Sequence, residues 1–172
     1  VEDKLYTALG FDGITRLGDA WMYDPEKDTW TGIAPYPDKV SSAAGFSIGG
    51  NFYVGSGFLG FNQKKFYKYI KGTDKWQKLA DMPEGRMLSK GLAIGDKGYI
   101  TLGRFWNGKM NGGRLLSDIV EYDPASNTWT KKGNFPGDAR QNHVTFCIDG
   151  KGYIVMGEDD TDRKSDVWCF KP

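Results

Sequence analysis

The feature that most constrains the fold is a fourfold internal repeat. A tyrosine precedes a glycine by four positions at Tyr6/Gly10, Tyr53/Gly57, Tyr99/Gly103 and Tyr153/Gly157. An aromatic residue also precedes a tryptophan by seven positions at Tyr23/Trp30, Tyr69/Trp76 and Tyr122/Trp129, and Phe170 holds the same place near the end of the chain. Successive glycines are 47, 46 and 54 residues apart. A period of this length indicates similar units that stack to bury a shared core.

Each unit has the pattern of four short strands. In the second unit, Ser42–Ile48 and Phe52–Gly57 are β-rich runs joined by a glycine turn, which indicates a hairpin. A third run follows at Phe66–Tyr69, and a polar turn leads to a fourth that opens at Trp76. Every glycine-free stretch of more than 14 residues contains a proline, so long helices are not expected. Four antiparallel strands per unit predict an all-β chain built of propeller blades.

The sequence resembles the kelch family. The resemblance rests on Tyr-x-x-x-Gly, on Tyr-Asp-Pro with a tryptophan seven residues after the tyrosine, and on Arg86 and Arg140, each eight residues before an aligned isoleucine. These features cover essentially the whole chain, which looks most like the galactose-oxidase-like kelch proteins of bacterial cell surfaces. The second glycine of the family's usual pair is replaced by Phe11, Phe58, Arg104 and Glu158.

Strand counting predicts 14 strands, divided 3, 4, 4 and 3 over segments of about 1–34, 35–82, 83–135 and 136–172. Kelch propellers generally close with six or seven blades, so the resemblance implies a kelch-type segment of about 3.5 blades. It would be part of a longer propeller or pair with another propeller half, with apolar outer flanks. Cys147 and Cys169 would lie about 9.6 Å apart on strands of one sheet, beyond disulfide reach. Two free, buried thiols are therefore expected.

Composition excludes several classes of function. Lys and Arg number 23 against 22 Asp and Glu, so neither nucleic acid nor an anionic membrane is an expected partner. No apolar run approaches the ~18 residues of a membrane span. His143 is the only histidine, which argues against most catalytic zinc and copper centres. The acidic loop 157–166 could hold Ca²⁺, but Arg163 and Lys164 offset its charge and favour a solvated loop, so no metal or cofactor is expected.

Function is expected where the repeats differ, because residues that recur in every unit, such as Trp30, Trp76 and Trp129, are explained by packing. The loop beginning at Arg104 is the longest between second and third strands, and it contains Trp106, Asn107, Lys109 and Asn111. An indole flanked by Arg and Asn can stack on a sugar or anchor a protein partner. The alternative is a loop that folds back over a blade edge.

A second group of candidates surrounds the innermost strands. Arg86 and Arg140 lie at matching positions there, and their guanidinium groups could recognise a carboxylate or hold neighbouring loops by bonds to carbonyls. The predicted ligand-binding residues are Trp106, Arg104, Asn107, Arg86, Arg140, Asn142, His143 and Glu158. No residue is predicted to be catalytic.

These observations favour a binding module over an enzyme. Its loop face would engage a glycan or protein partner at a bacterial surface, in an extracellular or cell-surface location. One alternative is a sugar mutarotase or epimerase acting on a sialate-like sugar, with Arg86, Arg140, His143 and Glu158 as candidates. Copper-dependent oxidation is poorly supported by a single histidine. A further alternative is a structural subunit of a larger assembly.

Overall fold

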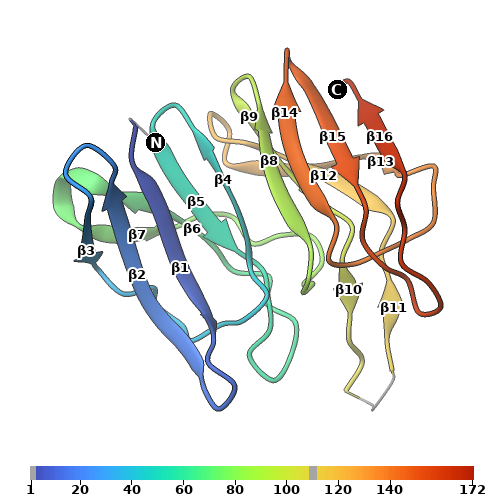
Figure 1. The fold of residues 1–172 in the computed structure, drawn as a ribbon, viewed down its shortest axis with the longest axis horizontal. Coiled ribbons are helices and arrows are strands. Elements are labelled where there is room, and N and C mark those ends of the chain that lie inside the picture. Colours follow the sequence, from blue (N-terminus) through green and yellow to red (C-terminus); the bar gives the residue numbers. More distant parts are fainter. Residues whose placement is uncertain (1–2, 109–111) are drawn as a thin grey trace.

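The computed structural model, which describes residues 3–108 and 112–172, is an arc of four separate antiparallel sheets (Figure 1). Each sheet is one blade. Blade 1 consists of β1 (Leu5–Phe11), β2 (Arg16–Asp24) and β3 (Thr29–Ile33), and blade 2 of β4 (Ala44–Ile48), β5 (Asn51–Gly55), β6 (Phe66–Ile70) and β7 (Lys75–Lys78). Blade 3 consists of β8 (Lys90–Ile94), β9 (Lys97–Thr101), β12 (Asp118–Asp123) and β13 (Thr128–Asn134), and blade 4 of β14 (Val144–Ile148), β15 (Lys151–Val155) and β16 (Val167–Phe170).

This division into 3, 4, 4 and 3 strands confirms the predicted 14-stranded propeller segment. The sequence did not predict a small additional hairpin, formed by β10 (Arg104–Phe105) and β11 (Arg114–Leu115), between the second and third strands of blade 3. The single helical segment among the described residues is a 3-10 turn at Lys71–Thr73. No helix in the described part of the chain is long and apolar enough to cross a membrane.

Local turn chemistry explains the hairpins. Gly49 and Gly50 both have positive φ (53° and 73°), as a two-residue turn between β4 and β5 requires. Asp149 and Gly150 form the matching turn in blade 4, with φ of 50° and 70°. The residues in place of the family's second glycine do not form turns, because Phe58, Arg104 and Glu158 lie extended in antiparallel bridges.

An apolar cluster fills the space between each pair of successive blades. Each cluster combines aromatic and aliphatic residues. Its members include Tyr36, Val54, Tyr67 and Trp76 between blades 1 and 2; Phe46, Phe66, Tyr122 and Trp129 between blades 2 and 3; and Tyr99, Ile119, Phe135 and Ile154 between blades 3 and 4. The core is therefore distributed along the arc. Each blade is stabilised by its neighbours.

The repeated glycine connects one blade to the next through its backbone. The N–H of Gly57 donates to the carbonyl of Arg86 at 2.7 Å, and that of Gly103 to the carbonyl of Arg140 at 3.0 Å. Gly10 makes the same bond to Val40 at 3.1 Å. At Gly103 only glycine fits, since φ is +98° and a Cβ would lie 2.7 Å from the carbonyl oxygen of Met87.

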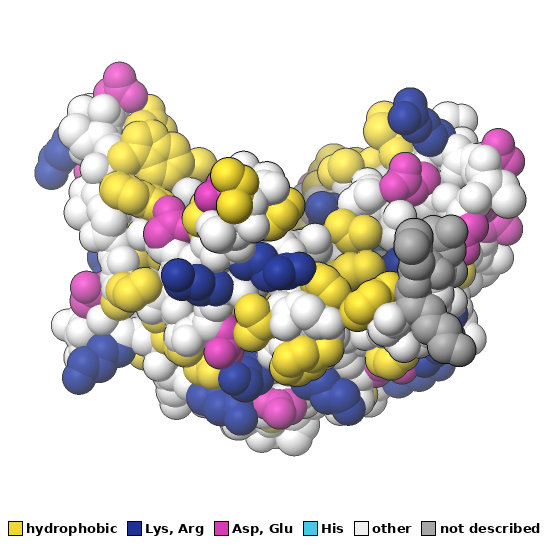
Figure 2. All heavy atoms as spheres, turned by 90° about the horizontal axis from the view of Figure 1, so that it is seen from below, with side chains coloured by type: hydrophobic (Ala, Val, Ile, Leu, Met, Phe, Trp, Pro, Cys, Tyr) yellow, Lys and Arg dark blue, Asp and Glu magenta, His cyan; other side chains and the backbone are white. Residues whose placement is uncertain are grey.

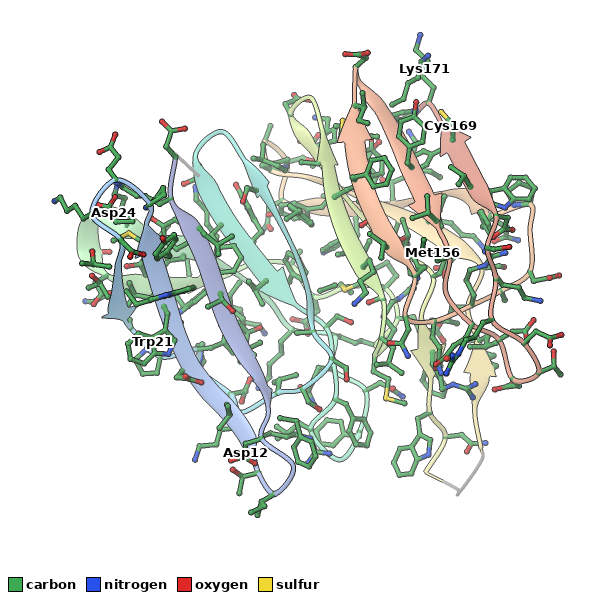
Figure 3. All side chains as sticks on the ribbon, viewed as in Figure 1. Asp12, Trp21, Asp24, Met156, Cys169 and Lys171 are labelled. Atoms are coloured by element: carbon green, nitrogen blue, oxygen red, sulfur yellow. The ribbon has the colours of Figure 1, made fainter. Side chains whose placement is uncertain are left out.

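The outer face of blade 4 exposes apolar side chains, as predicted for an end blade. Phe146 is 38% exposed, whereas Phe46 and Leu92, at the matching positions in blades 2 and 3, are 6% and 5% exposed. The predicted burial of the two thiols is wrong, because Cys147 and Cys169 are free but exposed. Cys169 pairs across the strands with Tyr153 and lies on this uncovered face (Figure 3), while Cys147 lies near the exposed end of β14.

Replacing Gly103 by alanine should lower the free energy of unfolding by about 3 kcal/mol or more, because the added methyl group would collide with the backbone of the same blade. Gly95 is the matched control. Its φ is +59°, but a Cβ there would meet nothing within 4 Å, so Gly95→Ala should cost only about 1 kcal/mol. Urea unfolding of the two variants measures the difference, and equal losses would contradict the role given to Gly103.

Candidate functional site

One end of the arc collects the loops between second and third strands, including the β10–β11 hairpin, at the lower edge of Figure 1. Figure 2 looks onto this face and shows hydrophobic side chains among lysines and arginines. A pocket of about 550 Å³ opens there between blades 3 and 4. We call it the loop-face pocket, and it is lined by Met87, Leu88, Arg104, Trp106, Gly112, Gln141 and Asp160.

Arg104 is the central charge of the loop-face pocket. Its Nε donates to Oε1 of Gln141 at 2.8 Å, and its guanidinium forms an ion pair with Asp160. The backbone of Arg104 also pairs with that of Met87 through two hydrogen bonds of 2.8 and 2.9 Å. The side chain of Arg104 is only 13% exposed, whereas that of Asp160 is 67% exposed. The arginine is therefore held in place, while its carboxylate partner lies in solvent.

Trp106 closes one side of this pocket and packs against blade 2. Its ring meets that of Phe58 edge-on, with centroids 5.2 Å apart. Its carbonyl accepts a bond from Nδ2 of Asn62 at 2.7 Å, and its N–H donates to Oδ1 of Asn62 at 3.2 Å. The loop therefore folds onto blade 2, and the half-buried indole of Trp106 also lines the loop-face pocket. Asn107 is exposed beside it, and Lys109 and Asn111 lie outside the described residues.

Glu158 lies next to the pocket and is held by two amides. Nδ2 of Asn142 donates to its Oε1 at 2.8 Å, and Nε2 of Gln141 donates to the same oxygen at 3.2 Å. The bonds from Asn142 and then Gln141 lower the pKa of Glu158, so it is a carboxylate at neutral pH. The structure thus brings Arg104, Glu158 and Asn142 together through Gln141.

The other two predicted arginines lie inside their own blades. Arg86 is fully buried and makes a two-pronged ion pair with Asp118 at 2.9 and 2.8 Å. Arg140 is equally buried and binds Asp166 in the same way. Each also donates to a carbonyl of its own blade, Arg86 to Leu102 and Arg140 to Met156. Both arginines therefore make the contacts expected if they hold neighbouring loops by bonds to carbonyls, the alternative to a role in binding a ligand.

The carboxylates of these pairs have lowered pKa values. Burial raises the pKa of Asp118, but the hydrogen bonds and charge of Arg86 outweigh it and leave the pKa below its usual value. The bonds from Arg140 lower the pKa of Asp166 to about 2. Blade 2 lacks this contact, because Val40 stands at the position of Arg86, and Lys65, at the position of Asp118, pairs instead with Asp38 at 3.0 Å.

His143 is buried between blades 3 and 4. Its Nε2 lies 2.7 Å from the hydroxyl of Thr101, and its Nδ1 has no hydrogen-bond partner among the described residues. Burial, followed by the charges of Lys90 and Arg140, lowers its pKa to about 3. His143 is therefore neutral at pH 7 and faces the blade interface, apart from the loop-face pocket.

The acidic loop is internally bonded. Asp159 forms an ion pair with Lys164 at 2.6 Å and accepts bonds from Thr161, while Asp160 pairs with Arg104. No group of three or more potential metal-ligating side chains is found among residues 3–108 and 112–172.

Sequence reasoning missed Gln141, Met87 and Leu88, which complete the loop-face pocket. The one available signal for Gln141 was its place in the sequence, directly between the predicted residues Arg140 and Asn142. The apolar wall depends on the approach of blade 3 to blade 4, which no local pattern encodes.

Comparison with known proteins finds a kelch motif and two kinds of relatives. A kelch motif model matches residues 1–35. Kelch-like protein 35 of Mus musculus is 33% identical over 175 residues, covering 100% of this chain and 28% of the mouse protein. N-acetylneuraminate epimerase of Pasteurella multocida (strain Pm70) is 34% identical over 196 residues, covering 92% of this chain and 51% of the epimerase.

A solved structure described as "Structure of YjhT" superposes with a TM-score of 0.79 at 21% identity, covering 92% of this chain and 56% of that one. At this identity the likeness supports the fold alone. The chain spans about a quarter of the mouse relative and about half of the epimerase.

The buried, neutral His143 should make stability fall between pH 7 and pH 5. In the unfolded chain the imidazole of His143 takes up a proton near pH 6.5, whereas in the folded chain it stays neutral down to about pH 3. Because the unfolded state binds the extra proton, stability is lost as the pH falls. The expected loss from this group is about 2 kcal/mol at pH 5. Urea unfolding at both pH values should show a smaller loss for His143→Gln, and an identical loss would contradict the assigned burial.

Proposed function

The chain belongs to the kelch-repeat family, and on that premise we propose that it is a protein-binding module whose loop-face pocket receives an acidic side chain of the partner. Kelch proteins generally bind protein partners. The observation that carries the proposal is the position of Arg104, a cation fixed in a pocket and paired with the largely exposed Asp160.

The chemistry of the pocket suits such an anchor. A partner carboxylate can replace Asp160 on the guanidinium of Arg104. The guanidinium is then paired with a carboxylate both in the free protein and in the complex. Met87, Leu88 and the indole of Trp106 supply an apolar wall around that contact. Central arginine and tryptophan residues within such a wall are typical hot spots of protein interfaces. A glycan ligand and an extracellular location stay predictions from the sequence.

Selection of binders from a random peptide library tests this proposal. The selected peptides should be rich in Asp or Glu, and Arg104→Ala or Trp106→Ala should weaken their binding about tenfold or more. Arg114→Ala is the matched control, since Arg114 lies on the same hairpin but outside the pocket. Selected peptides that bind Arg104→Ala as tightly as the wild type would contradict the proposal.

A second candidate function is favoured by the Pasteurella multocida relative, whose name describes an N-acetylneuraminate epimerase. The loop-face pocket could hold the carboxylate of a sialate at Arg104. Glu158, ionised and held by Asn142 and Gln141, could accept the proton of the anomeric hydroxyl while the bond between the anomeric carbon and the ring oxygen breaks and the ring oxygen takes a proton from water.

Exchange of N-acetylneuraminate anomers, followed by proton NMR, tests this candidate. Accelerated exchange that falls about a hundredfold or more in Glu158→Gln, but not in Glu84→Gln, would support an epimerase. Glu84 is a suitable control, because it pairs with Arg114 outside the pocket. Exchange at the uncatalysed rate with the wild type would exclude this activity for the chain as given.

A further inference from the structure

Gly18 interrupts the repeat at a position where blades 2 and 3 carry a side chain. Its carbonyl accepts a bond from the N–H of Tyr36 at 2.8 Å, which attaches β2 to the segment that connects blades 1 and 2. Lys64 and Ser117 accept the equivalent bonds in blades 2 and 3, at 2.8 and 2.6 Å. The φ of Gly18 lies outside the left-handed region, so the backbone alone does not require glycine there.

The missing side chain leaves an opening beside this segment. In blade 2 the side chain of Lys64 occupies the equivalent space, and its Nζ donates to the carbonyl of Pro83 at 2.9 Å. In blade 1 a pocket of about 400 Å³ lies between residues 15–19 and residues 35–39, and we call it the Gly18 cleft. A Cβ on Gly18 would lie 3.3 Å from Cγ of Lys39, so a larger side chain would fill this cleft.

Arg16 projects from β2 on the same side as Gly18, because alternate residues of a strand share a face. Its Cζ lies 4.8 Å from the ring centroid of Phe58 in blade 2 and 5.9 Å from that of Phe11. These cation–π contacts hold the guanidinium where blade 1 meets blade 2. They do not provide acceptors for its five N–H donors.

The side chain of Arg16 has no acceptor of its own. Its Nε is buried without a hydrogen-bond partner, and the guanidinium forms neither a hydrogen bond nor an ion pair within residues 3–108 and 112–172. At the same place in blade 2, Asn62 makes two hydrogen bonds to the backbone of Trp106, at 2.7 and 3.2 Å. Buried donors without acceptors are rare in folded proteins, so Arg16 is suited to an acceptor from outside the chain.

Lys39 adds a second unpaired cation to the Gly18 cleft. Its exposed ammonium makes no ion pair with any residue that the structure describes. Two carboxylates lie nearby, but both are engaged. Asp38 pairs with Lys65 at 3.0 Å, and Asp19, which alternation places on the opposite face of β2, accepts a bond from Nε1 of Trp21 at 2.7 Å. The cleft therefore has a surplus of positive charge.

We propose that the Gly18 cleft binds a small phosphate monoester. The guanidinium of Arg16 donates in-plane N–H bonds to two phosphate oxygens, and the ammonium of Lys39 balances the remaining charge. Leu17, Pro35 and Pro37 line the cleft and contact the organic group of the ligand.

Two properties of the cleft select this class of ligand. A phosphate monoester carries about two negative charges at pH 7, which matches the two cations, whereas a carboxylate carries one. The cleft volume lies within the range of small-molecule sites, about 300–1,000 Å³. No residue lines both the Gly18 cleft and the loop-face pocket, so this site is independent of the proposed protein-binding function. In Figure 3, Asp12 and Trp21 mark the stretch of chain that contains Arg16 and Gly18.

Calorimetric titration of the full chain with phenyl phosphate tests the proposal. Arg16→Gln should weaken binding about tenfold or more, and Lys39→Gln about fivefold. Arg16→Lys keeps the charge but loses the planar fork, so it should not restore the affinity of the wild type. Benzoate, which offers the same ring with a single negative charge, should bind about tenfold more weakly than phenyl phosphate.

Lys75→Gln is the matched control, because it removes the same charge from β7, outside the Gly18 cleft, and should leave the affinity unchanged. Lys39 is exposed, so its replacement tests the site even if Arg16→Gln does not fold. NMR should show phenyl phosphate shifting the amide signals of Gly18 and Lys39. The proposal is overturned if Lys39→Gln and Lys75→Gln bind equally well, if inorganic phosphate or benzoate binds as tightly as phenyl phosphate, or if the shifted amides lie elsewhere.

Discussion

The structure depends on one constraint: each small twisted sheet has two apolar faces and can bury them only against other sheets. The three inter-blade clusters are the direct result, and their aromatic members come from positions that recur in every unit. Backbone bonds such as that from Gly57 to Arg86 fix how closely neighbouring blades approach. With this spacing set, loops of neighbouring blades meet at one end of the arc and form the loop-face pocket.

The repeat made most of the fold predictable, because periodic residues report a periodic environment. Tyr53 and Gly57, for example, hold the same positions in blade 2 as Tyr99 and Gly103 hold in blade 3, so the division into blades follows from their spacing. The exposure of Cys169 could not be predicted this way. Its strand matches those of the inner blades, but its surroundings depend on whether another blade covers that face.

The candidate site was only partly predictable, since a binding pocket depends on approach between units. Arg104 and Trp106 stood out because they break the repeat, and both line the loop-face pocket. Arg86 was equally conspicuous, yet its guanidinium lies in a buried ion pair. Sequence position identifies an arginine on an inner strand, but it does not indicate whether the nearest carboxylate belongs to the same blade or to a partner.

The inner arginine and its carboxylate bear on how such a chain can diverge. Blade 3 sets Asp118 against Arg86, whereas blade 2 has Lys65 at the position of Asp118 and Val40 at that of Arg86. Transplanting residues 86–94 of blade 3 into blade 2 would bring the guanidinium next to the ammonium of Lys65 instead of a carboxylate. Repeats that look interchangeable in sequence therefore contain matched residue pairs, and recombination between repeats keeps the ion pair only if it carries both members.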